Sequence, residues 1–244
     1  MLPEICKIGH FVIYSYGLLL VIAFFVSSYL ACLRAKKERV DHEKIFNLCF
    51  YVFLWGIIGS RLFYVFNNAS FYIRNPLEII MLQHGGMAWF GGFIFGTSAA
   101  IVIIRKNRID LLKTLDLLVP FIALAQAIGR IGCLLNGCCF GRVSRFGIYF
   151  KVFDQVLIPT QLYSSLLLLL IFIILRFIQD KKHLPGQVLS SYLFLYSLKR
   201  FFIEFFRADS PKAFCGLTLF QALSIVMFIS SLLLFARISY IKKK

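Results

Sequence analysis

The sequence predicts an all-α integral membrane protein with about seven transmembrane helices. Of its 244 residues, 60% are hydrophobic and only 16% are charged, and the mean hydropathy is +0.82. The apolar residues form long segments, and short basic runs separate these segments. A water-soluble domain of this size would not carry so much apolar surface, so the lipid bilayer is the expected solvent.

Each apolar segment is close to the ~20 residues that a helix needs to cross the hydrocarbon layer. The first is longer than the core of a signal peptide, and we expect it to be retained. No internal repeat is evident, so residues 1–244 are predicted to form a single polytopic membrane domain. The predicted spans are residues 11–33, 46–68, 87–104, 114–135, 159–178, 186–206 and 216–236.

The basic residues predict the orientation of the helices. Loops 34–45, 105–113 and 176–183 and the tail 237–244 together contain sixteen lysines and arginines, whereas the opposite side has seven. The more basic side is normally cytoplasmic. We therefore expect the N-terminus on the outer side of the membrane and the basic C-terminal tail, residues 237–244, in the cytoplasm. Because the net charge of +16 is scattered rather than collected in one stripe, nucleic acid is not an expected partner.

Four basic residues lie inside apolar segments: Arg61, Arg130, Lys199 and Arg200. Such residues are costly at membrane depth unless they face a polar cavity or another polar group. Arginine binds phosphate through two parallel hydrogen bonds, which lysine does not provide. We expect Lys199 to be structural and the three arginines, Arg61 included, to bind an anionic substrate.

The stretch "KRFFIEFFR" places Arg200, Glu204 and Arg207 at the i, i+4 and i+7 positions of one helix face. One interpretation is an internal salt bridge that only holds helices together. The other is an anion site, because the cationic side chains outnumber Glu204. The surplus positive charge favours the anion site.

The stretch "HGGMAWFGG", residues 84–92, combines a histidine with four glycines. Histidine titrates near neutral pH and suits proton transfer. Glycines allow a close approach of the backbone, which at membrane depth is tolerated where it lines a cavity or packs on protein. An interfacial loop with a tight turn is an equally good interpretation of the spacing.

The stretch "GRIGCLLNGCCFG", residues 129–141, surrounds Arg130 with three cysteines. The spacing of Cys133, Cys138 and Cys139 is poor for a metal site, because neighbouring side chains rarely converge on one ion. A disulfide and a reactive thiol remain open alternatives. We expect small packing residues, with no metal and no cofactor.

Six stretches occur in the order and spacing of the prolipoprotein diacylglyceryl transferase family, which the chain resembles from about residue 10 to 236. They are "YSYGLLL", "GSRLFYVF", "HGGMAWFGG", "GRIGCLLNGCCFG", "IPTQLYSS" and "RFFIEFFRADS". The resemblance implies a multi-pass enzyme of the bacterial inner membrane. Such an enzyme transfers the diacylglyceryl group of phosphatidylglycerol to the lipobox cysteine of preprolipoproteins and releases glycerol 1-phosphate.

The resemblance also implies roles for individual residues. It makes Arg130 the residue that binds phosphatidylglycerol, Arg200 the second essential arginine and His84 the histidine that is the candidate catalytic base. Positions that match the family's binding residues are Tyr16, Asn136, Gly137, Gly141, Glu204 and Arg207. The sequence departs from the family's better-known pattern at Cys133, Cys138 and Ser164, so contacts around the lipid head group are expected to differ.

A second function fits part of the pattern. A membrane carrier or binder of anionic lipid or phosphate would use the arginines without chemistry, but it would leave His84 without a role. Carriers commonly have related halves, and the sequence has none. We therefore expect a monomeric enzyme whose partners are phosphatidylglycerol and lipobox-bearing signal peptides.

Overall fold

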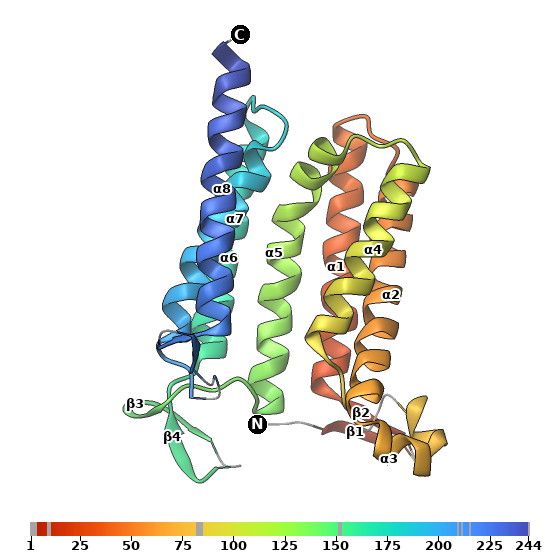
Figure 1. The fold of residues 1–244 in the computed structure, drawn as a ribbon, viewed down its shortest axis with the longest axis vertical. Coiled ribbons are helices and arrows are strands. Elements are labelled where there is room, and N and C mark those ends of the chain that lie inside the picture. The colour runs from red at the N-terminus through yellow and green to blue at the C-terminus, as the bar shows by residue number, and fades with distance from the viewer. Residues whose placement is uncertain are drawn as a thin grey trace. The chain divides into compact units, whose positions relative to one another are not determined.

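The computed structural model describes residues 4–8, 11–81, 85–150, 153–208, 210, 212–214 and 216–243 (Figure 1). The helices are α1 (Ser15–Lys37), α2 (His42–Asn67), α3 (Ala69–Arg74), the short 3-10 helix η1 (Pro76–Ile79), α4 (Trp89–Lys106), α5 (Leu111–Asn136), α6 (Thr160–Asp180), α7 (Gln187–Glu204) and α8 (Leu219–Lys243). The strands form three antiparallel pairs. They are β1 (Glu4–Ile8) with β2 (Phe11–Tyr14), β3 (Val143–Phe150) with β4 (Gln155–Leu157), and β5 (Lys212–Phe214) with β6 (Leu217–Thr218).

The predicted helical membrane fold is confirmed, because every predicted span coincides with a long helix. Six of the described helices are long and apolar enough to cross a membrane, and α7 is not among them. Helix α7 is more polar than a typical membrane-spanning helix, because it contains Lys199, Arg200 and Glu204. Seven crossings and an outward N-terminus stay predictions.

The first predicted span is wrong at its start. Residues 11–14 form β2 and pair with β1, and helix α1 begins only at Ser15. The segment Val12, Ile13 and Tyr14 consists of β-branched and aromatic residues, which favour a strand. Apolar composition alone does not distinguish such a strand from the first turn of a helix.

The chain divides into two compact units, residues 28–111 and residues 1–27 with 112–244. In the smaller unit, α2 packs on α4 through glycines. A Cβ atom on Gly59 would lie 2.6 Å from the carbonyl oxygen of Gly91, and one on Gly91 would overlap the carbonyl of Gly59. Small residues at both positions therefore allow the two backbones to touch, as is common between membrane helices.

Alanine at Gly91 should lower the free energy of unfolding by about 1–3 kcal/mol, because the added methyl group overpacks the α2–α4 contact. Thermal unfolding in detergent measures the change. Alanine at Gly17 of α1 is the matched control, since nothing lies within 4 Å of a Cβ atom there. That control should be neutral or slightly stabilising. Equal effects of the two variants would contradict the packing.

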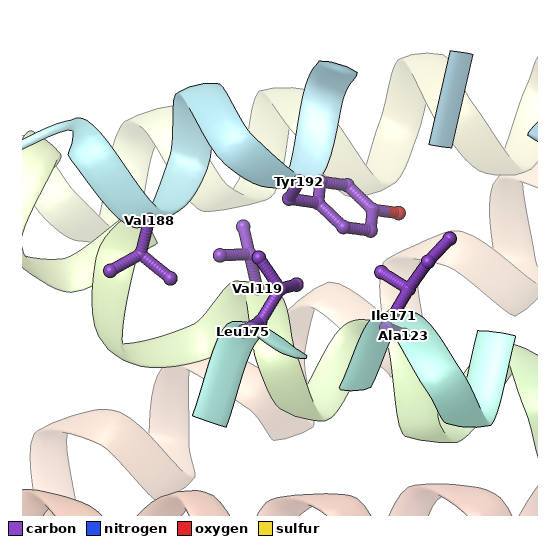
Figure 2. Packing of buried hydrophobic residues seen from close by; sticks show 6 residues of the cluster. All are labelled: Val119, Ala123, Ile171, Leu175, Val188 and Tyr192. Carbon is purple, nitrogen blue, oxygen red and sulfur yellow. The ribbon is translucent and has the colours of Figure 1, made fainter. Parts of the chain in front are cut away.

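In the larger unit, α5, α6 and α7 share an apolar core (Figure 2). Leu175 of α6 and Val188 of α7 are fully buried and lie beside Val119 of α5. The cluster consists of Val119, Ala123, Ile171, Leu175, Val188 and Tyr192. This core fixes the helices whose ends carry the predicted site residues.

Polar contacts fasten one end of the same three helices. The carboxylate of Asp116 on α5 accepts hydrogen bonds from the backbone N–H groups of Gly186 (2.6 Å) and Leu189 (2.8 Å), at the start of α7. The side chain of Gln179 on α6 donates to the carbonyl oxygen of Asp116 at 3.0 Å. Asp116 therefore satisfies donors that the first turn of α7 would otherwise leave without partners.

Candidate functional site

The stretch that begins with Arg130 continues from the end of α5 into a loop, residues 137–142. Two side chains at the start of α6 hold this loop. The hydroxyl of Thr160 donates to the carbonyl oxygen of Cys139, and the amide of Gln161 donates to that of Cys138, both at 2.7 Å. Both residues belong to the stretch "IPTQLYSS", and the sequence alone predicts no role for them.

The same loop is attached to the chain that follows α7. Gly141 pairs with Arg207 in an antiparallel bridge, and the N–H of Arg142 donates to the carbonyl oxygen of Phe206 at 2.9 Å. A Cβ atom on Gly141 would lie 2.7 Å from the same Phe206 oxygen and 2.7 Å from the Cβ of Ile158. Glycine is therefore required at position 141, and its backbone brings Arg207 to the loop.

Glu204 connects two of the predicted arginines. Its buried carboxylate oxygen Oε2 lies 3.1 Å from Nη2 of Arg200 and 3.9 Å from Nε of Arg207. The predicted proximity of the three side chains is confirmed. The prediction that one helix carries all three residues is wrong in one respect. Helix α7 ends at Glu204, and Arg207 contacts the Glu204 carboxylate from the turn that follows the helix.

Thr218 completes the surroundings of Glu204. Its hydroxyl donates to Oε1 of Glu204 at 3.0 Å and also accepts from the N–H of Gln221 at 3.2 Å. The side-chain oxygen Oε1 of Gln221 in turn accepts a hydrogen bond from the N–H of Thr218. The two bonds together form a capping box at the start of α8. The Thr-x-x-Gln spacing before an apolar run is the local sequence signal from which this cap could be predicted.

Arg130 lies on the last turns of α5 and is half-buried. Within the described part of the chain, its guanidinium makes no hydrogen bond or ion pair. Arg130, Arg200 and Arg207 lie close enough to interact electrostatically. Since arginine stays protonated, Arg130 keeps a positive charge for which no described side chain supplies an ion pair. The arrangement is suited to an anion.

Two other predicted residues accompany Arg130. The ring of Tyr16, on α1, packs on α5, where a Cβ atom on Gly132 would lie 3.3 Å from Cδ2 of Tyr16. Asn136 is exposed at the end of α5, and Gly137 follows with φ 74°. Lys199, expected to be structural, lies 4.5 Å from the ring centroid of Tyr196.

The three cysteines of the loop converge. The sulfur atoms of Cys133, Cys138 and Cys139 lie within 4.8 Å of one another, and all three are free thiols. Hydrogen bonds with the other two thiols lower the pKa of the Cys139 thiol, and the bond with Cys133 has the larger effect. The charges of Arg207 and Arg130 act in the same direction. The expectation that neighbouring cysteines do not converge is wrong here.

Arg61 is surrounded by backbone carbonyls in the smaller unit. Its side chain is buried and lies 5.3 Å from the ring centroid of Tyr72. It donates to the carbonyl oxygens of Glu78, Ile79 (3.0 Å), Met81 (3.1 Å), Gly85 and Gly86 (3.0 Å). These hydrogen bonds stabilise the buried guanidinium and hold the backbone before and after the histidine-containing segment. A direct contact of Arg61 with substrate stays a prediction.

His84, the predicted base, lies outside the described residues, as do residues 82 and 83. The glycines after it are described. Gly85 and Gly86 have φ angles of 77° and 79°, a conformation that favours glycine. A Cβ atom on Gly86 would lie 2.9 Å from Nη1 of Arg61, so the segment packs on protein at this point.

The comparison with known families identifies the family to which the chain belongs. Residues 3–237 match the family model described as "Prolipoprotein diacylglyceryl transferase". The chain belongs to this family. Membership in the prolipoprotein diacylglyceryl transferase family confirms the resemblance seen in the sequence and makes the chain a membrane-embedded transferase.

Individual relatives agree along nearly their whole length. The chain is 32% identical to the phosphatidylglycerol–prolipoprotein diacylglyceryl transferase of Clostridium tetani, over 96% of this chain and 97% of the relative. It is 35% identical to the protein of the same name from Clostridium kluyveri, over 85% and 86%. It is 34% identical to that of Finegoldia magna, over 90% and 88%.

Proposed function

We propose that the chain transfers the diacylglyceryl group of phosphatidylglycerol to the lipobox cysteine thiol of a preprolipoprotein, in the bacterial inner membrane. Family membership supports the reaction class. The structural observation that carries the proposal is Arg130, which lies near the ion-paired group of Arg200, Glu204 and Arg207 and has no ion pair among the described residues. A phosphodiester anion supplies the ion-pair partner that Arg130 lacks among the described residues.

The reaction is a displacement at a primary carbon. The sulfur of the acceptor forms a carbon–sulfur bond, while the bond from the same carbon to a phosphate oxygen breaks. The proton of the thiol passes to a base, and glycerol 1-phosphate leaves with the electron pair of the broken bond. Negative charge therefore grows on the phosphate, and preorganised arginines stabilise it best in a site of low dielectric constant.

The described residues divide this work. Arg130 binds the phosphate directly, and Glu204 holds Arg200 and Arg207 beside it through the two ion pairs. Tyr16 lies next to Arg130 and lines the site together with Asn136, Gly137 and Gly141. Arg61 orders the segment around His84 through carbonyl contacts. The protein acts as a monomer.

Alanine at His84 should lower turnover more than lipid binding, because a base assists formation of the thiolate nucleophile. Raising the pH should partly restore the rate, since more of the acceptor thiol then ionises without help. The pH–rate profile of His84→Ala against the parent protein measures this. An unchanged profile would make His84 a residue that positions its loop.

Replacement of Cys133, Cys138 and Cys139 together by serine should leave measurable transfer. The acceptor thiol arrives on the substrate, and a diacylglyceryl thioether on the enzyme would not readily be cleaved by a second thiol. Transfer rate and intact enzyme mass, with the acceptor peptide withheld, measure the effect. A well-folded triple variant without activity, or a lipid adduct on the parent enzyme, would contradict the one-step displacement.

Complementation tests the function in cells. Expression of the chain in bacteria depleted of their own transferase should restore lipid attachment to a reporter lipoprotein, seen as a mass increase. A reporter whose lipobox cysteine is serine is the control and should stay unmodified. Failure of an expressed, membrane-inserted chain to modify any cysteine reporter would contradict the proposal.

A further inference from the structure

The three-thiol cluster is not used by the proposed reaction, and it has the geometry of a metal site. We propose that Cys133, Cys138 and Cys139 bind one soft, thiophilic metal ion of the Cu(I) class through their three sulfur atoms. Two thiolates bound to one ion at ~2.3 Å lie about 4 Å apart. The three sulfur atoms already lie within 4.8 Å of one another, so small side-chain movements suffice.

The backbone explains why adjacent cysteines converge here. The N–H of Cys138 donates to the carbonyl oxygen of Cys133 at 3.1 Å, which folds the loop back on the last turn of α5. Gly137 and Cys139 both have positive φ angles, 74° and 62°. In an extended chain the side chains of residues 138 and 139 would point to opposite sides. The left-handed conformation of Cys139 turns its sulfur to the side of the other two.

The loop is held in this shape from outside the cluster. The bonds from Thr160 and Gln161 fix the carbonyl groups of Cys139 and Cys138, both at 2.7 Å. A preformed site binds an ion without first ordering its ligands, which strengthens binding. All three cysteines are partly exposed, so an ion has access to them.

The donor set selects the class of ion. Thiolates are soft ligands and favour Cu(I) over the hard ions that prefer oxygen. Among the described residues, the group contains three sulfur donors and no carboxylate or histidine. Structural zinc is normally four-coordinate, so three sulfurs suit a three-coordinate ion better. One Cu(I) with three thiolates carries two negative charges.

Anaerobic titration of the reduced, detergent-solubilised protein with Cu(I), against a chromophoric Cu(I) chelator, tests the proposal. We expect one equivalent of copper per chain and a thiolate-to-copper absorption band. Serine at any one of the three cysteines should weaken binding at least about tenfold. Cys49→Ser is the matched control, because Cys49 lies in α2 outside the cluster. This variant should bind Cu(I) as tightly as the parent protein.

A second measurement uses the unaltered protein and so does not depend on the folding of variants. Copper should protect Cys133, Cys138 and Cys139 from alkylation, as measured by peptide mass spectrometry, while the exposed Cys6 still reacts. Absence of stoichiometric copper binding, binding that persists in the triple serine variant, or preferential binding of Zn²⁺ would each overturn the proposal.

Discussion

Lysine at position 130 should lower the transfer rate at least about a hundredfold, and alanine should abolish transfer. Lysine keeps the positive charge but loses the planar fork that binds two phosphate oxygens together. Loss of one preorganised donor to a developing charge typically costs about 10²–10³ in rate. The rate of diacylglyceryl transfer at saturating phosphatidylglycerol measures the effect at equal protein abundance.

Arg145→Lys is the matched control, because Arg145 is exposed on β3. It should transfer at the parent rate. Full activity of Arg130→Lys at normal abundance would contradict bidentate binding of phosphate by Arg130.

Alanine at Arg200 should abolish transfer and also destabilise the fold. The change removes the 3.1 Å ion pair and leaves a buried carboxylate with Arg207 at 3.9 Å. Breaking one side of a buried pair typically costs about 3–5 kcal/mol. Thermal unfolding and the transfer rate, measured on the same preparation, report the two effects separately.

The double variant Arg200→Ala with Glu204→Gln separates stability from chemistry. Neutralising Glu204 removes the uncompensated charge, so the double variant should regain part of the stability that Arg200→Ala loses. It should not regain transfer, because the arginine is still missing. Recovery of transfer together with stability would mean that the pair serves only to hold the helices, which was the alternative interpretation of this triplet.

The helices could be predicted from the sequence because each apolar run has the length of a membrane span. The strands could not. β2 is a four-residue apolar segment directly before α1, and hydropathy does not separate the two. The end of α7 at Glu204 was also missed, since the apolar pattern continues through Phe205 and Phe206 while the hydrogen-bonded helix does not.

Local spacing predicted part of the site and long-range contacts decided the rest. Arg200 and Glu204 are four residues apart on one helix, so their pairing follows from sequence. The bonds from Thr160 and Gln161 to the cysteine loop span more than twenty residues and have no local signal. The positive φ of Cys139 is likewise set by the loop, which is why the cysteine cluster was not predicted.

The transfer of a diacylglyceryl group to an acceptor thiol is measured most directly by the mass of a lipobox peptide after incubation with the purified protein and phosphatidylglycerol. We predict a peptide heavier by one diacylglyceryl group in thioether linkage, with glycerol 1-phosphate released in equal amount, and no product with Arg130→Ala. An unmodified peptide in the presence of well-folded parent protein and bound phosphatidylglycerol would contradict the proposed transfer reaction.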